Sequence, residues 1–141
     1  MHLDLKIFEA PSADMIQQLN HALQGYLESQ LPGLSPESED KVFMVCKYDE
    51  QGNLVGGLLA NCYWNGLEID TLWVADSERG KGVGSLLVES AESYGAKNGA
   101  VIAFLKTMDA KPFYEKLGYE VYGVLEDRPI GTLLYHMKKR I

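Results

Sequence analysis

The chain has 141 residues, of which 46% are hydrophobic and 23% are charged, as in an ordinary globular protein. Its 13 lysines and arginines stand against 20 aspartates and glutamates, so the formal net charge is −7. This balance argues against the basic face that a nucleic-acid groove needs, and it favours a small or cationic partner. The length fits a single domain over residues 1–141 with a buried core.

The N-terminus and the cysteines bear on the compartment. The opening residues, MHLDLKIFEA, carry no secretory signal pattern, and no apolar run is long enough to span a membrane. Cys46 and Cys62 form no CxxC pair and have no metal-ligand spacing, and the histidines are scattered. We therefore expect a cytoplasmic protein with buried free thiols, no metal and no membrane partner.

The first predicted elements are a strand and a helix. Residues 3–10, LDLKIFEA, alternate between apolar and polar side chains, which predicts a strand. Ser12 follows a proline and can cap a helix. The apolar residues of that helix fall on one face and are Met15, Ile16, Leu19, Leu23, Tyr26 and Leu27. The polar loop at 31–40, LPGLSPESED, is too short to separate domains.

Three strands are predicted next, at 41–48, 54–64 and 67–74. The dipeptide Asn65-Gly66 between the last two is a strong hairpin signal. The three strands should therefore form an antiparallel meander.

The second half of the chain predicts a βαβ unit followed by a hairpin. The glycine stretch RGKGVG at 79–84 precedes a helix whose apolar residues recur at helical spacing, and AVIAFLKT at 100–107 is a buried strand. The strands of such a unit are parallel and their crossover is right-handed. A short helix follows at 109–118, with Asp109 as its cap and Gly118 at its end, and then strands at 119–125 and 131–139.

The glycine stretch predicts an anion site. The start of a helix offers free backbone N–H groups and partial positive charge, and glycines let a ligand approach the backbone closely. Arg79 and Lys81 add full charges, which favours a phosphate over the alternative of a tight turn without a ligand. A Walker loop is absent, and a dinucleotide fingerprint fails because Ser85 stands where its third glycine belongs.

Two motifs resemble those of the GNAT superfamily of N-acetyltransferases. One is R-x-x-G-x-G at Arg79, Gly82 and Gly84, and the other is FYEKLGYEVYG at 113–123. With the upstream strands and first helix, the resemblance covers nearly the whole chain. It implies an α/β fold with a mixed, twisted sheet of six or seven strands flanked by helices. The βαβ unit would be the acyl-CoA-binding core, with its two strands splaying apart.

The resemblance implies acetyl-CoA as co-substrate. The pyrophosphate would lie on the loop amides of Arg79, Gly80, Lys81, Gly82, Val83, Gly84 and Ser85. The pantetheine would pair with backbone groups of Leu72, Trp73 and Val74, a strand that carries a bulge in many members. Thr107 stands where members often have an asparagine that holds the pantetheine. Its hydroxyl either bonds the cofactor or has no such role.

The chemistry needs a proton acceptor, because only a neutral amine can attack a thioester. Glu68 and Asp70 lie two apart on the strand that borders the cleft, so they should share a face. Glu68 stands near the base of some members and Asp70 is the second choice. Alternatively, either carboxylate faces solvent or binds the positive charge of the acceptor. Tyr114 matches the tyrosine acid that protonates the leaving thiolate, and without the resemblance it would be an ordinary packed tyrosine.

The expected function is transfer of an acetyl group from acetyl-CoA to a primary amine by direct attack. The acceptor could be a small amine, an aminoglycoside or polyamine, or a protein amine. The alternative is a non-catalytic acyl-CoA-binding regulatory module, which would need neither Tyr114 nor a carboxylate beside the cleft. No nucleic-acid partner is expected, and a homodimer is left open.

Overall fold

A computed structural model of the chain describes residues 4–141, apart from the side chain of Ser38. The internal contacts divide the chain into two units, one ending at Pro36 and the other running from Glu37 to Ile141. The expectation of a single domain over residues 1–141 stays a prediction. None of the helices in the described part is long and apolar enough to cross a membrane.

The first unit contains the helix α1, Ala13–Gln30. The oxygen of the Ser12 side chain accepts a hydrogen bond from the Met15 amide at 3.2 Å, which confirms the predicted cap. No residue of α1 is buried within the described structure. The predicted strand at 3–10 is wrong for residues 4–10, which form no strand, and Leu3 lies outside the described residues. Alternation alone does not make a strand, because its backbone groups must pair with a neighbour.

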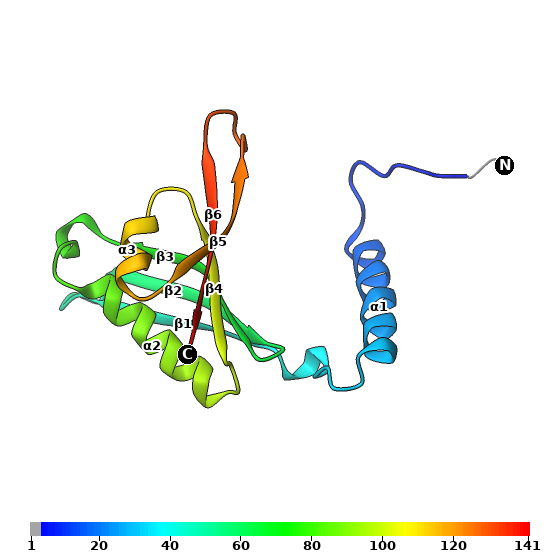
Figure 1. Cartoon of the computed structure of the whole chain (residues 1–141), viewed down its shortest axis with the longest axis horizontal. Coiled ribbons are helices and arrows are strands. Elements are labelled where there is room, and N and C mark those ends of the chain that lie inside the picture. Colours follow the sequence, from blue (N-terminus) through cyan, green and yellow to red (C-terminus); the bar gives the residue numbers. More distant parts are fainter. Residues whose placement is uncertain (1–3) are drawn as a thin grey trace. The chain divides into compact units, whose positions relative to one another are not determined.

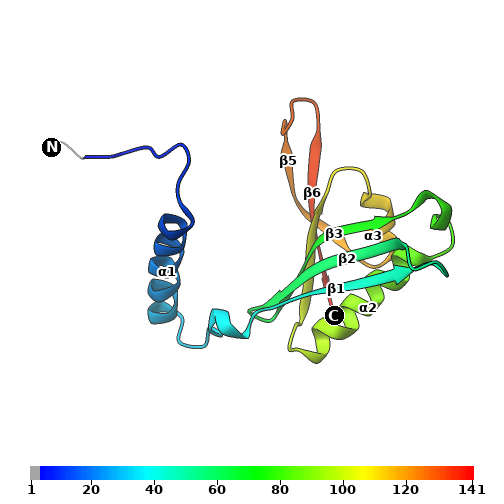
Figure 2. The ribbon, with the colours of Figure 1, turned by 180° about the vertical axis from the view of Figure 1, so that it is seen from behind.

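The second unit is built on one six-stranded sheet in the order β1-β2-β3-β4-β6-β5 (Figures 1 and 2). Its elements are β1 (Lys41–Tyr48), β2 (Leu54–Tyr63), β3 (Gly66–Val74), α2 (Val83–Lys97), β4 (Ile102–Thr107), α3 (Lys111–Lys116), β5 (Glu120–Glu126) and β6 (Leu133–Arg140). Short 3₁₀ turns lie at Glu37–Glu39 and Asp76–Glu78. Among these strands only β3 and β4 pair in parallel, so the sheet is mixed, as predicted.

The meander of β1, β2 and β3 is confirmed, but its hairpin turn lies one residue earlier than predicted. Trp64 and Asn65 occupy the two turn positions, with φ of 47° and 60°. Gly66 is already in β3, where a side chain would meet the Phe104 ring at 3.1 Å. The glycine is therefore needed for packing against β4, and Asn65 supports the turn by donating to the Gly99 carbonyl at 2.8 Å.

The core lies between the sheet and α2. Leu67 and Ile69 of β3 are buried on the face that α2 covers, and Gly95 of α2 approaches Leu67 so closely that a Cβ would lie 3.3 Å from it. Cys62 is buried in this core, as expected. Cys46 is exposed, contrary to the expectation. It pairs with Gly57, whose neighbour Gly56 faces α2, so Cys46 lies on the face of the sheet that α2 does not cover.

The strands β3 and β4 part in the middle of the sheet. Their pairing covers Gly66–Ile69 against Ile102–Leu105 and stops there, although both strands continue. Beyond that point β3 stays with β2 and β4 stays with β6. The register of β2 and β3 also shifts, so that Asp70 is an extra residue in a bulge opposite Leu59. The predicted splay is therefore present, and the bulge lies at its root.

Candidate active site

A cavity of about 670 Å³ lies beside the start of α2. Its lining comes from the end of β3, the glycine loop, the first turn of α2 and the segment that leads into α3. The residues are Leu72, Val74, Glu78, Arg79, Gly80, Gly82, Val83, Gly84, Ser85, Asp109, Ala110, Pro112 and Phe113. Most of the predicted cofactor residues meet here. Trp73, Lys81 and Thr107 do not appear in this lining.

Two glycines of the loop adopt the left-handed backbone that glycine tolerates best. Gly80 and Gly82 have φ of +78° and +81°, and a Cβ at either position would meet no atom within 4 Å. Gly82 is the N-terminal cap of α2, so the amides of the following first turn have no partner within the helix. The side chain of Val83 is buried and packs against Gly56 of β2.

Gly84 is a glycine for a different reason. A Cβ at this position would lie 3.1 Å from the Phe113 ring of α3 and 3.8 Å from Val74. It allows α2 and α3 to pack closely, and its φ is not in the left-handed region, so a left-handed backbone does not explain this glycine. Gly84 also lines the first cavity, and its role in the approach of a ligand stays a prediction.

The two cations of the loop are exposed and each is paired with an acidic neighbour. Arg79 forms an ion pair with Asp76 at 3.1 Å, and its Nε donates to the Val74 carbonyl at 3.1 Å. Lys81 lies 3.7 Å from Glu78. A phosphate would have to compete with these carboxylates, and the Val74 carbonyl already carries a hydrogen bond.

A second cavity of about 440 Å³ continues from the first along the splay and shares Leu72, Asp109 and Ala110 with it. Asp70 and Tyr114 both line it. Thr107 also lines it, but its hydroxyl oxygen accepts from the Ala110 amide at 3.1 Å.

This hydrogen bond of Thr107 lies at the start of α3, where Asp109 was expected to cap the helix. The N-terminal cap is Ala110 and makes no side-chain cap bond, so the prediction for Asp109 is wrong. Asp109 lines both cavities instead.

Tyr114 is buried on α3, with 6% of its surface exposed. Its ring lies between those of Phe113 and Tyr119, at centroid distances of 5.0 and 5.7 Å. Burial, and then the negative charge of Asp109, raise the pKa of Tyr114 to about 12. The phenol therefore keeps its proton at neutral pH and can act as a hydrogen-bond donor.

A third hollow of about 260 Å³ is lined by both predicted carboxylates, Glu68 and Asp70. Glu68 accepts a hydrogen bond from the Tyr63 hydroxyl at 3.2 Å. Burial and the charge of Glu68 raise the pKa of Tyr63, so this donor stays protonated. Asp70 lines both this hollow and the one that contains Tyr114, whereas Glu68 lines only this one.

Sequence reasoning missed three residues of the third hollow, namely Lys106, Tyr122 and His136. Lys106 and His136 are paired across β4 and β6, and the Tyr122 and His136 rings lie 5.9 Å apart. In the sequence, Lys106 follows the apolar run VIAFL and His136 follows LLY, and neither pattern by itself indicates a site.

Comparisons with known proteins show the family of the chain. The model of the acetyltransferase (GNAT) family matches residues 6–119. Blasticidin-S acetyltransferase of Streptomyces morookaense is 32% identical over 104 residues, which are 72% of this chain and 76% of that protein. Acetyltransferase Atu2258 of Agrobacterium fabrum is 27% identical over 106 residues, which are 74% of this chain and 77% of that protein.

The fold also matches solved structures. A crystal structure of an acetyltransferase from Bacillus cereus superimposes with a TM-score of 0.85 and 29% identity, covering 96% of this chain and 98% of that one. The resemblance drawn from the two motifs is confirmed by the family match, the relatives and the fold. The chain belongs to the acetyltransferase (GNAT) family.

Proposed function

We propose that this acetyltransferase transfers an acetyl group from acetyl-CoA to a primary amine by direct attack. The observation that carries the proposal is the junction of two cavities, which join the glycine loop of α2 to Asp70 and Tyr114 through shared lining residues. An anion-binding end, a carboxylate and a protonated phenol therefore border one cleft.

The first cavity fits the phosphate end of acetyl-CoA. Gly80 and Gly82 leave the loop backbone open, and the first-turn amides of α2 are free within the helix. Arg79 and Lys81 supply positive charge at the rim, once released from Asp76 and Glu78. Bound acetyl-CoA would supply the activated acetyl thioester.

Asp70 is the better placed of the two carboxylates to take a proton from the amine. It lies in the bulge at the root of the splay and lines the cavity of Tyr114 as well as the third hollow. Glu68 lies two residues before Asp70 in β3, and its carboxylate accepts a hydrogen bond from the Tyr63 hydroxyl. We propose Asp70 as the proton acceptor and Glu68 as a binding group for the positive charge of the acceptor, the reverse of the sequence-based ranking.

Tyr114 would stabilise the leaving sulfur by donating a hydrogen bond. A thiol has a pKa of about 8.5, which is well below the pKa of about 12 of this buried phenol. Full proton transfer from Tyr114 to the thiolate would therefore be uphill. Donation of a hydrogen bond requires no such transfer and is stronger to a charged acceptor.

The test is a thiol-release assay with acetyl-CoA across a panel of small amines, polyamines, aminoglycosides and peptides with free N-termini. We expect thiol release that depends on at least one amine. If acetyl-CoA raises the melting temperature but no amine causes release, the protein is the non-catalytic acyl-CoA binder instead.

A further inference from the structure

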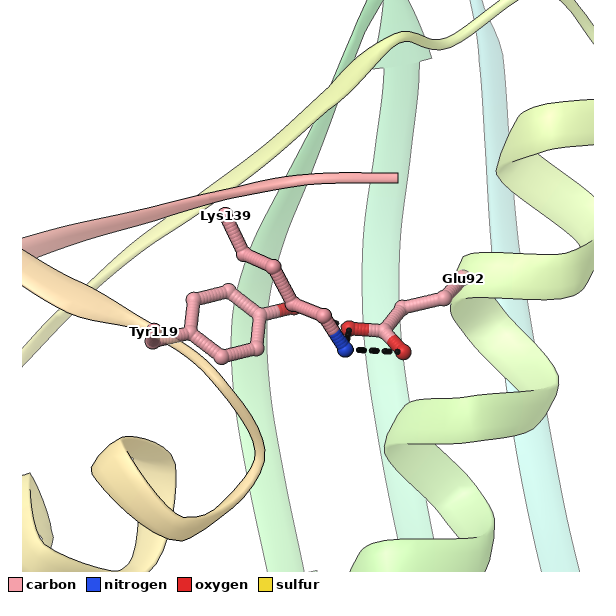
Figure 3. A network of polar contacts seen from close by, with 3 residues as sticks. All are labelled: Glu92, Tyr119 and Lys139. Atoms are coloured by element: carbon pink, nitrogen blue, oxygen red, sulfur yellow. Dashed lines mark hydrogen bonds and ion pairs between the residues drawn. The ribbon is translucent and has the colours of Figure 1, made fainter.

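A charged cluster lies next to Tyr114 and is not used by the proposed chemistry. Glu92 of α2 accepts from the Tyr119 hydroxyl at 2.8 Å and from Lys139 of β6 at 3.0 and 3.1 Å (Figure 3). The Lys139 nitrogen also lies 5.6 Å from the centre of the Tyr119 ring. The side chain of Glu92 is only 12% exposed and that of Lys139 is 27% exposed.

Such a cluster is a poor source of stability. The cost of removing two charges from water offsets much of their attraction, so an apolar pair of similar volume is often as stable. What the cluster does provide is a fixed position for its side chains, because two charge-assisted hydrogen-bond donors hold one carboxylate. It joins α2, the segment between α3 and β5, and β6.

The cluster reaches Tyr114 through Tyr119. The two rings meet edge to face at 5.7 Å and 73°, and the Tyr119 amide donates to the Tyr114 carbonyl at 3.0 Å. Gly118 turns the chain between them with φ of +97°, and a Cβ there would lie 3.4 Å from the Lys139 side chain.

The helix α3 depends on such contacts for its position. It has six residues, too few for a helix that is stable by itself, and its N-terminal cap makes no side-chain bond. Phe113 of α3 packs against Gly84 of α2, and Tyr119, three residues after the end of α3, donates its hydrogen bond to Glu92. Tyr114 lies in the chain between these two contacts.

We propose that Glu92, Tyr119 and Lys139 form a positioning network that fixes the phenol of Tyr114 in the cleft. The network touches no reacting atom and acts through the Tyr119 ring. This inference rests on the proposed function, since it assigns a catalytic consequence to the position of Tyr114.

The test is a double-mutant cycle between Tyr119→Phe and Tyr114→Phe, with kcat and the KM for acetyl-CoA measured in each variant. Tyr119→Phe keeps the ring and removes only the bond to Glu92. It should lower kcat on the order of 10-fold and leave the KM within about twofold. In the Tyr114→Phe background, the same change should alter kcat by less than about twofold. Equal losses in both backgrounds would overturn the proposal, and so would an unchanged kcat in a folded Tyr119→Phe protein.

A second measurement needs no activity. The NMR signals of the Tyr114 ring in the free protein should shift in Glu92→Gln, which removes the charge but keeps the shape. Glu89→Gln is the matched control, because it removes an exposed charge from the same helix outside the network. It should leave both the signals and kcat unchanged. Unmoved Tyr114 signals in folded Glu92→Gln would overturn the proposal.

The two failures can be told apart. A wild-type protein that releases no thiol with any amine would refute the proposed function. The NMR comparison would then decide alone whether the network holds Tyr114 in place.

Discussion

Tyr114 combines a buried ring with a place in the lining of the cleft. Its neighbours Phe113 and Tyr119 hold the ring, and burial beside Asp109 keeps the hydroxyl protonated. Because this environment raises the pKa of Tyr114, the hydroxyl keeps its proton and remains a hydrogen-bond donor at neutral pH.

We expect Tyr114→Phe to lower kcat by about 10²-fold or less, since general-acid assistance spans about 10²- to 10⁴-fold and a hydrogen bond alone belongs at its lower end. The phenylalanine keeps the ring, so the KM for acetyl-CoA should change little. The loss should shrink for a donor whose thiol is more acidic, because that sulfur needs less stabilisation. Steady-state kinetics with two donor thioesters measures both effects. If the Tyr114→Phe variant has the kcat of the wild type, Tyr114 serves only the packing of the core.

The two carboxylates of β3 can be separated by their pH profiles. Asp70→Asn should lower kcat/KM near neutral pH, and the rate should recover as pH rises, because the amine then loses its proton without help. Glu68→Gln should instead raise the KM for a cationic amine and leave the shape of the profile unchanged. If the two profiles are exchanged, Glu68 is the proton acceptor and the ranking drawn from the sequence is right.

At the scale of elements, the cleft depends on how α2 meets its neighbours. Its N-terminus carries the glycine loop, its middle carries Glu92, and Gly84 and Gly95 bring it close to α3 and β3. The packing of one helix thus sets the geometry of the proposed anion site and supports the position of α3.

Gly84→Ala should lower the stability of the protein by about 1–3 kcal/mol, the usual cost of overpacking. The added methyl group would lie 3.1 Å from the Phe113 ring of α3, so that ring would have to shift. Gly25→Ala is the matched control, since Gly25 is also in a helix and a methyl group there would meet no atom within 4 Å. That change should leave the melting temperature equal or higher, because alanine favours helix by about 1 kcal/mol. Thermal unfolding of both variants gives the comparison, and equal stability of the two would refute the packing argument.

At the scale of the whole molecule, binding of acetyl-CoA should stabilise the folded chain against unfolding. A ligand that binds only the folded chain stabilises it by about 2.7 kcal/mol at a concentration 100 times its Kd. Acetyl-CoA should therefore raise the melting temperature in a concentration-dependent way, whereas NAD and ATP should do little. If NAD raised the melting temperature as much as acetyl-CoA does, that result would count against acyl-CoA as the ligand of the glycine loop.

The sequence by itself determined most of the local elements and the family. The cap at Ser12, the meander, the βαβ unit and the glycine loop before α2 all follow from residues close together in the sequence. Such features are encoded by periodicity, by turn residues and by short motifs, and those are visible without the fold. The two motifs were specific enough to identify the family.

The tertiary structure alone decided features that depend on residues far apart in the chain. The predicted strand at residues 4–10 did not form, because a strand needs a partner that no local pattern supplies. Gly84 serves a contact with Phe113, and the bulge sets Asp70 beside the cavity of Tyr114. The bonds from Tyr119 and Lys139 to Glu92 span 27 and 47 positions. Only packing brings such groups together, since the sequence specifies their chemistry but not their distance.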